Sequence, residues 1–218
     1  MSLEPVITYT LFKPGATIAE VDGLSIQAFD KKVMSVCVPP LFVKRVKEHL
    51  KDTSVKTTAV VGFPFGYSII EAKVAETVMA IVDGADVIEI TANLNALKNA
   101  DWQYLAKEIN TILPIIRSKG RIAGVVLESS ILDDKELVAC CDMYGAAGVD
   151  YIKTASGMLE KEDSVETIRL VRNCLANQVK IKTGGPVHNI KHANELLTAG
   201  ADYISLDNGI LRDSGKLS

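Results

Sequence analysis

The feature that most constrains the fold is a regular alternation of short apolar runs with longer amphipathic segments. Alternating strand and helix units favour a parallel sheet with right-handed crossovers, and eight such units predict an α/β chain folded as a (β/α)8 TIM barrel. A doubly wound open sheet is the alternative, but no G-x-G-x-x-G follows the first run. The eight runs are Val6–Leu11, Ser35–Val38, Thr57–Val61, Val87–Thr91, Ile122–Leu127, Tyr151–Thr154, Lys180–Thr183 and Tyr203–Leu206.

Between the runs, apolar residues recur at the spacing of a helix face. Asp163-Ser164 supplies capping chemistry at the start of one helix, and Gly148 falls where another should end. Because no Pro/Gly/Ser-rich linker interrupts the pattern, we expect one domain over residues 1–218. Two helix faces are predicted, formed by Ile70, Val74, Val78 and Ile81, and by Ile168, Val171 and Leu175.

The composition is that of a soluble protein that forms a core. Hydrophobic residues make up 48% of the chain, and the formal net charge is only −3. No basic block suggests nucleic acid, and no apolar run approaches the roughly 18 residues that span a membrane. The N-terminus lacks the pattern of a signal peptide. We therefore expect a cytoplasmic protein that binds neither nucleic acid nor membrane.

Cysteine and histidine give no metal signature. The four cysteines form no C-x-x-C pair, and no histidine lies at ligand spacing from them. Buried, reduced thiols are typical of a cytosolic protein. We expect no metal and no cofactor.

Two lysines stand inside strand-like runs near the C-terminus, Lys153 and Lys182. A strand of a parallel sheet is covered on both faces, so an ammonium group there is costly unless it is paired or used. Two ammonium groups about 4 Å apart repel by about 4 kcal/mol at an effective dielectric near 20, or about three pKa units. The pair is therefore expected to lower a lysine pKa toward neutrality, which makes the amine nucleophilic.

A carboxylate, Glu89, stands in the middle of another run, between Ile88 and Ile90. A buried Glu–Lys pair that only holds the barrel together is one interpretation. However, one carboxylate cannot neutralise two cations, and a purely structural core gains from apolar replacements. Unrelieved charge of this kind is typical of active sites. A neutral lysine forms an imine with a carbonyl, and a carboxylate can shuttle the protons.

In a barrel the chemistry gathers at the C-terminal ends of the strands. The catalytic candidates are Lys153, Lys182 and Glu89. Further polar or small residues near those ends are candidates for substrate binding: Cys37, Thr154, Ser156, Gly184, Gly185, Asp207 and Asn208.

Six segments, in this order, resemble the deoxyribose-phosphate aldolase family over nearly the whole chain. The resemblance implies a (β/α)8 class I aldolase that interconverts 2-deoxy-D-ribose 5-phosphate with D-glyceraldehyde 3-phosphate and acetaldehyde without a metal. It implies that Lys153 forms the Schiff base and that Lys182 lowers its pKa. The segments are Thr10–Pro14, Ser35–Pro40, Val61–Gly66, Gly84–Asp86, Tyr151–Gly157 and Lys182–Gly185.

The sequence departs from the family pattern at both ends of the expected site. Glu89 stands where the family has an aspartate that works in proton transfer, and Gly124 stands where it commonly has a lysine. Thr8-Tyr9 replaces the usual Asp-His pair. In the phosphate region, Pro186 lacks a backbone N–H, and Asp207-Asn208 replaces two serines. The imine-forming half is retained and the phosphate-holding half is altered.

We therefore predict a Schiff-base aldolase that acts on a small sugar phosphate or aldehyde, with an altered phosphate site. One alternative is another Schiff-base barrel aldolase or transaldolase with a different sugar. A second is a non-catalytic barrel that binds a metabolite or a partner. A homodimer is possible for a barrel of this size, although no heptad or apolar stripe identifies its surface.

Overall fold

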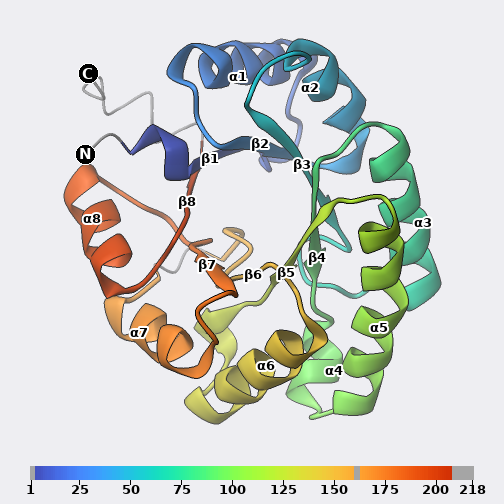
Figure 1. Cartoon of the computed structure of the whole chain (residues 1–218), viewed down its shortest axis with the longest axis vertical. Helices are drawn as coiled ribbons and strands as arrows, with labels where there is room; N and C mark the ends of the chain where they lie inside the picture. The colour runs from blue at the N-terminus through green and yellow to red at the C-terminus, as the bar shows by residue number, and fades with distance from the viewer. Residues whose placement is uncertain (1–2, 160–162, 208–218) are drawn as a thin grey trace.

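The computed structural model describes residues 3–159 and 163–207 and contains a ring of eight parallel strands surrounded by helices (Figure 1). The predicted TIM barrel is therefore confirmed, and each predicted run overlaps one strand. The strands are β1 (Ile7–Thr10), β2 (Ser35–Val38), β3 (Lys56–Val61), β4 (Val87–Thr91), β5 (Ile122–Val126), β6 (Tyr151–Lys153), β7 (Lys180–Lys182) and β8 (Ile204–Asp207).

The strand order is β7-β6-β5-β4-β3-β2-β1-β8, so neighbours in sequence are neighbours in space. One further bridge, between Lys182 and Tyr203, joins β7 to the residue before β8 and completes the ring. The α-helices are α1 (Ile18–Lys31), α2 (Val43–His49), α3 (Ile70–Val82), α4 (Leu94–Lys98), α5 (Trp102–Ser118), α6 (Asp134–Ala147), α7 (Val165–Cys174) and α8 (Ile190–Ala199), and short 3-10 turns are η1 (Glu4–Val6), η2 (Pro40–Phe42) and η3 (Ser129–Ile131).

The helix ends follow the local chemistry of the sequence. Asp133 caps α6 in a reciprocal pair with Glu136, and Gly148 ends that helix in the left-handed conformation. The hydroxyl of Ser164 accepts a hydrogen bond from the Thr167 N–H at the start of α7. The predicted boundaries at Gly148 and Asp163-Ser164 are confirmed.

The two predicted helix faces had different outcomes. On α7, Ile168 and Val171 are fully buried and Leu175, just past its end, is nearly so, as predicted. On α3 the predicted face is confirmed only in part: Ile70 is buried and Val74 and Ile81 pack against the core, but Val78 is 41% exposed. The buried residues of that helix are Ile70, Lys73, Thr77 and Ala80, so its buried face is rotated from the predicted one and includes two polar side chains.

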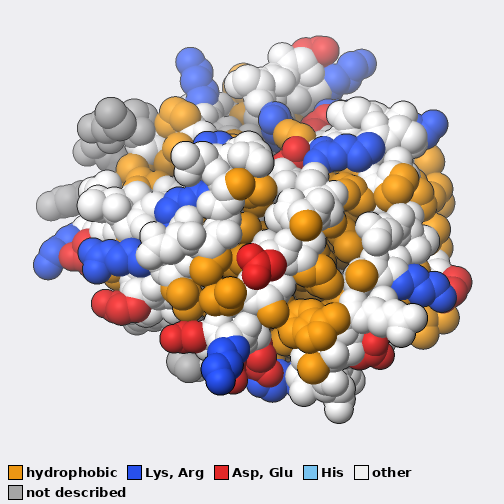
Figure 2. All heavy atoms as spheres, turned by 60° about the horizontal axis from the view of Figure 1, so that its bottom comes forward, with side chains coloured by type: hydrophobic (Ala, Val, Ile, Leu, Met, Phe, Trp, Pro, Cys, Tyr) orange, Lys and Arg blue, Asp and Glu red, His pale blue; other side chains and the backbone are white. Residues whose placement is uncertain are grey.

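Consequently α3 leaves apolar side chains at the surface. Met79 and Val82 are 54% and 70% exposed. Figure 2 shows hydrophobic side chains at the surface on the side where Figure 1 places α3. Among the described residues, no helix is long and apolar enough to cross a membrane.

The register of the strands places the interior side chains in levels. Lys153 lies directly beside Lys182 on the neighbouring strand. One level away, Glu89, Gly124 and Tyr151 are consecutive partners across β4, β5 and β6. Because side chains alternate along a strand, Lys153 and Tyr151 share the interior while Ile152 packs against the helices. The fold therefore brings both lysines and the carboxylate into one space.

Candidate active site

The interior of the barrel contains one carboxylate bound to two ammonium groups. Lys153 Nζ lies 3.2 Å from Glu89 Oε2, and Lys182 Nζ lies 2.7 Å from Glu89 Oε1. All three side chains are at most 1% exposed. In their ionised forms the three groups carry a net charge of +1, because one carboxylate compensates only one of the two cations.

Tyr151 holds this carboxylate in place from the same level of the barrel. Its hydroxyl donates a 2.9 Å hydrogen bond to Glu89 Oε1. Lys182 Nζ lies 5.5 Å from the centroid of the Tyr151 ring, within the range of a cation–π contact. Tyr151 therefore contacts both Glu89 and Lys182.

Gly124 provides the room for the Tyr151 ring. A Cβ atom at position 124 would lie 2.3 Å from Tyr151 Cζ, far inside the contact distance of two carbon atoms. Any side chain at this position would displace the ring and its hydroxyl. The departure at Gly124 is thus compensated locally, since a tyrosine from β6 occupies the space and binds the carboxylate.

The charges of the cluster favour its ionised state. Burial raises the pKa of Glu89, but the charges of Lys153 and Lys182 outweigh burial and bring the pKa to about 2. Burial lowers the pKa of Lys153, but the carboxylate of Glu89 outweighs it, and the pKa is raised above its ordinary value. The expectation of a lowered Lys153 pKa is therefore wrong for the resting site, because the carboxylate contacts both lysines.

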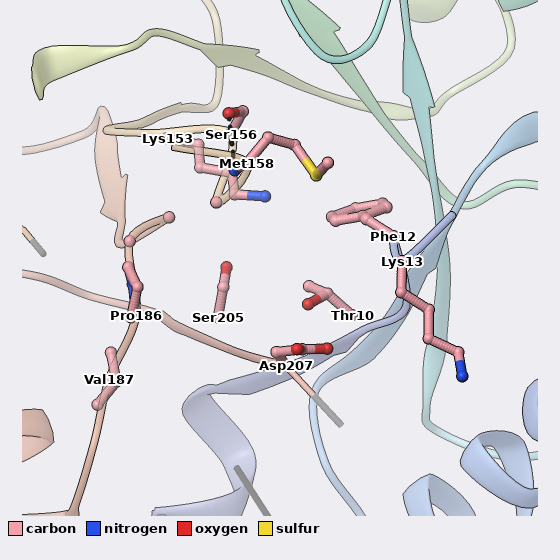
Figure 3. A pocket seen from close by; sticks show the side chains of 13 residues that line it. Thr10, Phe12, Lys13, Lys153, Ser156, Met158, Pro186, Val187, Ser205 and Asp207 are labelled. Atoms are coloured by element: carbon pink, nitrogen blue, oxygen red, sulfur yellow. Dashed lines mark hydrogen bonds between the residues drawn. The ribbon is translucent and has the colours of Figure 1, made fainter. Parts of the chain in front are cut away.

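A cavity of about 200 Å³ opens at the C-terminal ends of the strands, with Lys153 in its wall (Figure 3). Phe12 lies across this space, with Lys153 Nζ 5.3 Å from the centroid of its ring. The lining residues are Thr10, Phe12, Lys13, Lys153, Ser156, Gly157, Met158, Gly184, Gly185, Pro186, Val187, Ser205 and Asp207. The Lys153 amine therefore faces both its carboxylate partner and a space that a small molecule can enter.

Lys182 lies on the opposite side of the cluster. It lines a second cavity, of about 250 Å³, together with Tyr151 and residues near the N-terminal ends of the strands. Lys182 is absent from the lining of the upper cavity. The two lysines are consequently unequal in access, and only Lys153 reaches the upper cavity.

Buried carboxylates fix the loops after β6 and β7. Glu128 Oε2 accepts hydrogen bonds from the backbone N–H and the hydroxyl of Ser156, at 3.1 and 2.5 Å. Asp163 Oδ2 accepts hydrogen bonds from the Gly184 and Gly185 N–H groups, at 2.8 and 3.0 Å. The same oxygen accepts a 2.7 Å hydrogen bond from the hydroxyl of Thr154.

The structure brings some of the predicted substrate-binding residues to the cavity and leaves others away from it. Ser156, Gly184, Gly185 and Asp207 line it. Cys37 is buried, its Sγ lies 3.6 Å from Glu89 Oε2, and it is not in the cavity wall.

Burial raises the pKa of the Cys37 thiol, so it stays protonated. Thr154 is also buried behind the wall, bound to Asp163. Asn208 lies outside the described residues.

Sequence reasoning missed several residues of the site. Tyr151 shares a strand face with Lys153, and this spacing was a usable signal for its position. Asp163 was interpreted only as helix-capping chemistry, because nothing in its local sequence indicates a contact with the loop after β7. Phe12, Met158 and Ser205 reach the cavity from three separate segments, which the pattern of one segment cannot predict.

Within the described residues, no group of three histidine, cysteine, aspartate or glutamate side chains is arranged to hold a metal ion. The polar side chains that line the cavity carry amine, carboxylate and hydroxyl groups.

Comparisons with known proteins point to one family, although no family model matches the chain. The deoxyribose-phosphate aldolase of Caldanaerobacter subterraneus subsp. tengcongensis is 35% identical over 211 residues, which cover 96% of this chain and 91% of that protein. The deoxyribose-phosphate aldolase of Thermoanaerobacter pseudethanolicus is 36% identical over 211 residues and covers 96% and 95% of the two chains.

Solved structures agree with the sequence comparison. The tetrameric deoxyribose-phosphate aldolase of Aeropyrum pernix superposes with a TM-score of 0.87 at 26% identity, covering 93% of this chain and 86% of that one. An aldolase named QR15 gives a TM-score of 0.88 at 27% identity, covering 96% and 93%. This chain is a member of the deoxyribose-phosphate aldolase family, and so a carbon–carbon lyase.

Proposed function

We propose that this chain is a Schiff-base aldolase that joins acetaldehyde to an acceptor aldehyde, the reaction of its family, and that Lys153 is the nucleophile. The single observation that supports this most is the position of Lys153 Nζ, which lies in the cavity wall and 3.2 Å from Glu89. Lys182 is buried on the far side of the same carboxylate and serves as a charge partner.

The first step is the release of a proton from Lys153. Its pKa is raised in the resting site, so the amine starts as an ammonium group. Glu89 is the carboxylate within reach to accept the proton. Once Glu89 is neutral, the charge of Lys182 is no longer compensated, and its repulsion keeps Lys153 neutral. In this proposal Lys182 acts on the Lys153 pKa only after Glu89 has taken the proton.

The remaining steps follow from amine chemistry. The neutral amine attacks the acetaldehyde carbonyl. Glu89 then returns its proton to the hydroxyl group of the adduct, which leaves as water and gives an iminium ion while Glu89 becomes ionised again. A base, Glu89 or a water that it holds, removes a proton from the adjacent methyl carbon to give an enamine. The enamine carbon attacks the acceptor carbonyl, whose oxygen takes up a proton. Water then releases the product and restores Lys153.

Trapping of the imine tests this assignment. The protein is incubated with acetaldehyde, reduced with borohydride and digested, and the ethylated lysine is located by mass spectrometry. We expect the adduct on Lys153 and its absence in Lys153→Ala. Lys180→Ala is the matched control, because Lys180 is a β7 lysine paired with Asp202. An unmodified Lys153 in the wild-type protein would exclude the catalytic assignment and favour a binding barrel.

The acceptor end of the cavity favours a second proposal, that the phosphate site of the family is altered in this chain. Pro186 and Asp207 both line the cavity. Pro186 has no backbone N–H to donate to a phosphate, and Asp207 brings a negative charge that repels one. This is also the observation that favours a Schiff-base aldolase for a different sugar. We further propose that the protein is cytoplasmic and forms a homodimer. Size-exclusion chromatography with light scattering tests the oligomeric state.

A further inference from the structure

The side chain of Asp163 occupies the backbone groups that a glycine loop would otherwise offer to an anion. Three donors converge on its Oδ2: the N–H groups of Gly184 and Gly185 and the hydroxyl of Thr154. Asp163 is 3% exposed and is not part of the cavity lining. The carboxylate therefore lies behind the loop, and the loop directs its N–H groups away from the cavity.

Successive backbone N–H groups in a glycine loop are a common means of holding a phosphate. Here two of them are hydrogen-bonded to an internal carboxylate, and the next residue, Pro186, has no N–H. From Gly184 to Pro186 the loop thus has no N–H group free for a ligand.

Gly184 is also packed closely against the neighbouring loop. A Cβ at this position would lie 1.7 Å from the Ala155 carbonyl oxygen, so the loops after β6 and β7 are in direct backbone contact. The Asp163 hydrogen bonds tie together the same two loops. Turning the two N–H groups toward the cavity would break these bonds and leave a buried carboxylate without donors, which is costly.

The cavity wall itself offers oxygen atoms rather than cations at this end. Asp207 contributes a carboxylate, and Ser205 contributes a hydroxyl that points into the cavity (Figure 3). Ser205 Oγ has no hydrogen-bond partner among the described residues, although Ser205 is only 6% exposed. Lys13 also lines the cavity, but its ammonium group is paired with Glu20 and extends away from the space. These groups suit the hydroxyl groups of a neutral ligand.

We propose that Asp163 is a specificity-determining residue that replaces a bound phosphate, and that the acceptor of this aldolase is an uncharged hydroxyaldehyde. The proposal rests on the aldolase function above. Asp163 accepts the hydrogen bonds of the two loop N–H groups, and Asp207 repels a phosphate that enters the cavity. Ser205 and Asp207 bind the hydroxyl groups of the acceptor. A phosphorylated acceptor would meet the Asp207 carboxylate and no free N–H group from Gly184 to Pro186.

The test compares D-glyceraldehyde with D-glyceraldehyde 3-phosphate as acceptors for acetaldehyde, by the ratio of their kcat/KM values. We expect wild type to favour the unphosphorylated acceptor. Asp163→Ala frees the two N–H groups, and we expect it to shift the ratio toward the phosphorylated acceptor by tenfold or more. Asp163→Asn keeps an acceptor oxygen but removes the charge, so its ratio should lie between the two. It also serves where the alanine variant does not fold.

Asp133→Ala is the matched control, because it removes an aspartate with a backbone hydrogen bond at the start of α6. It changes the net charge equally, and its acceptor ratio should equal that of wild type. A wild-type preference for the phosphorylated acceptor, or an Asp163 series with unchanged ratios, would overturn the proposal.

Two further measurements separate this proposal from the aldolase assignment. Borohydride trapping of acetaldehyde tests the imine alone, and the adduct should form on Lys153 in wild type and in both Asp163 variants. Binding of inorganic phosphate, measured by calorimetry, tests the N–H groups without catalysis. We expect binding to Asp163→Ala at least tenfold tighter than to wild type. Equal affinities would contradict the replacement role even if trapping succeeds.

Discussion

Residues 3–159 and 163–207 contain two buried lysine–glutamate clusters, which differ in stoichiometry and access. Between α3 and α5, Lys73 Nζ lies 2.6 Å from Glu108 Oε1 and donates a further 2.7 Å hydrogen bond to the Thr91 carbonyl. Inside the barrel, Glu89 binds both Lys153 and Lys182. The first cluster has equal charges and lines neither of the two cavities described above, whereas the second has an excess cation and opens to a cavity through Lys153.

The pKa values of the two clusters shift in opposite directions. Burial lowers the pKa of Lys73 and raises that of Glu108, because one partner does not fully offset the loss of water. The pKa of Glu89 falls to about 2 and that of Lys153 rises, because the charges in the barrel outweigh burial. Burial alone therefore does not mark a catalytic charge. The unequal stoichiometry and the open cavity distinguish the barrel cluster.

The largest expected effect is the loss of activity when Lys153 of the barrel cluster is replaced. Lys153→Met should lower kcat/KM by about a thousandfold or more, because the other lysine of the cavity wall, Lys13, is paired with Glu20 and cannot take its place. It should leave the protein folded, because Lys182 and Glu89 remain as a balanced pair. Steady-state kinetics and thermal unfolding measure the two effects. An active Lys153→Met protein would place the chemistry elsewhere.

The corresponding change in the other cluster should act on stability. Lys73→Met leaves Glu108 buried without its cation, so we expect the free energy of unfolding to fall by about 3–5 kcal/mol. The fraction that remains folded should keep its kcat. Urea denaturation and active-site titration by borohydride trapping test both statements. A loss of kcat without loss of stability would remove the distinction between the clusters.

A smaller effect is expected where Tyr151 holds Glu89. Tyr151→Phe removes the hydrogen bond that orients the Glu89 carboxylate. Because this bond is made to a charged group, we expect kcat to fall by about tenfold or more. Gly124→Ala should lower kcat similarly, because its Cβ would displace the ring. The double variant should be little worse than either single variant, since both disturb the same contact. Additive losses would show that the two residues act independently.

The smallest effect concerns stability in acid. The pKa of Glu89 is about 2 in the folded protein against an ordinary value of 4.5. Its ionised form therefore contributes stability above pH 4.5, and this contribution is lost as the pH falls from 4.5 to about 2. The difference in unfolding free energy between wild type and Glu89→Gln should narrow over this range. A difference that does not change with pH would contradict the lowered pKa.

The fold was predictable because it depends on local periodicity. The eight runs and the buried face of α7 follow from apolar spacing alone. The face of α3 did not, because Lys73 and Thr77 are polar residues buried by tertiary contacts. Within the site, strand periodicity predicted that Lys153 faces inward, but the direction of its pKa depends on the distance to Glu89. The role of Asp163 depends on two loops that meet only in the folded chain.

Asp163 lies in the sequence between β6 and β7, just before α7. It donates or accepts no hydrogen bond with either lysine in those described, and its charge is the smallest of the named causes that raise the pKa of Lys153. Under the proposal above, the choice of acceptor and the formation of the imine are then encoded by separate residues. An aspartate and an alanine codon differ by one nucleotide. Evolution or a designer would therefore be able to change the acceptor in one mutational step while the amine chemistry stays intact.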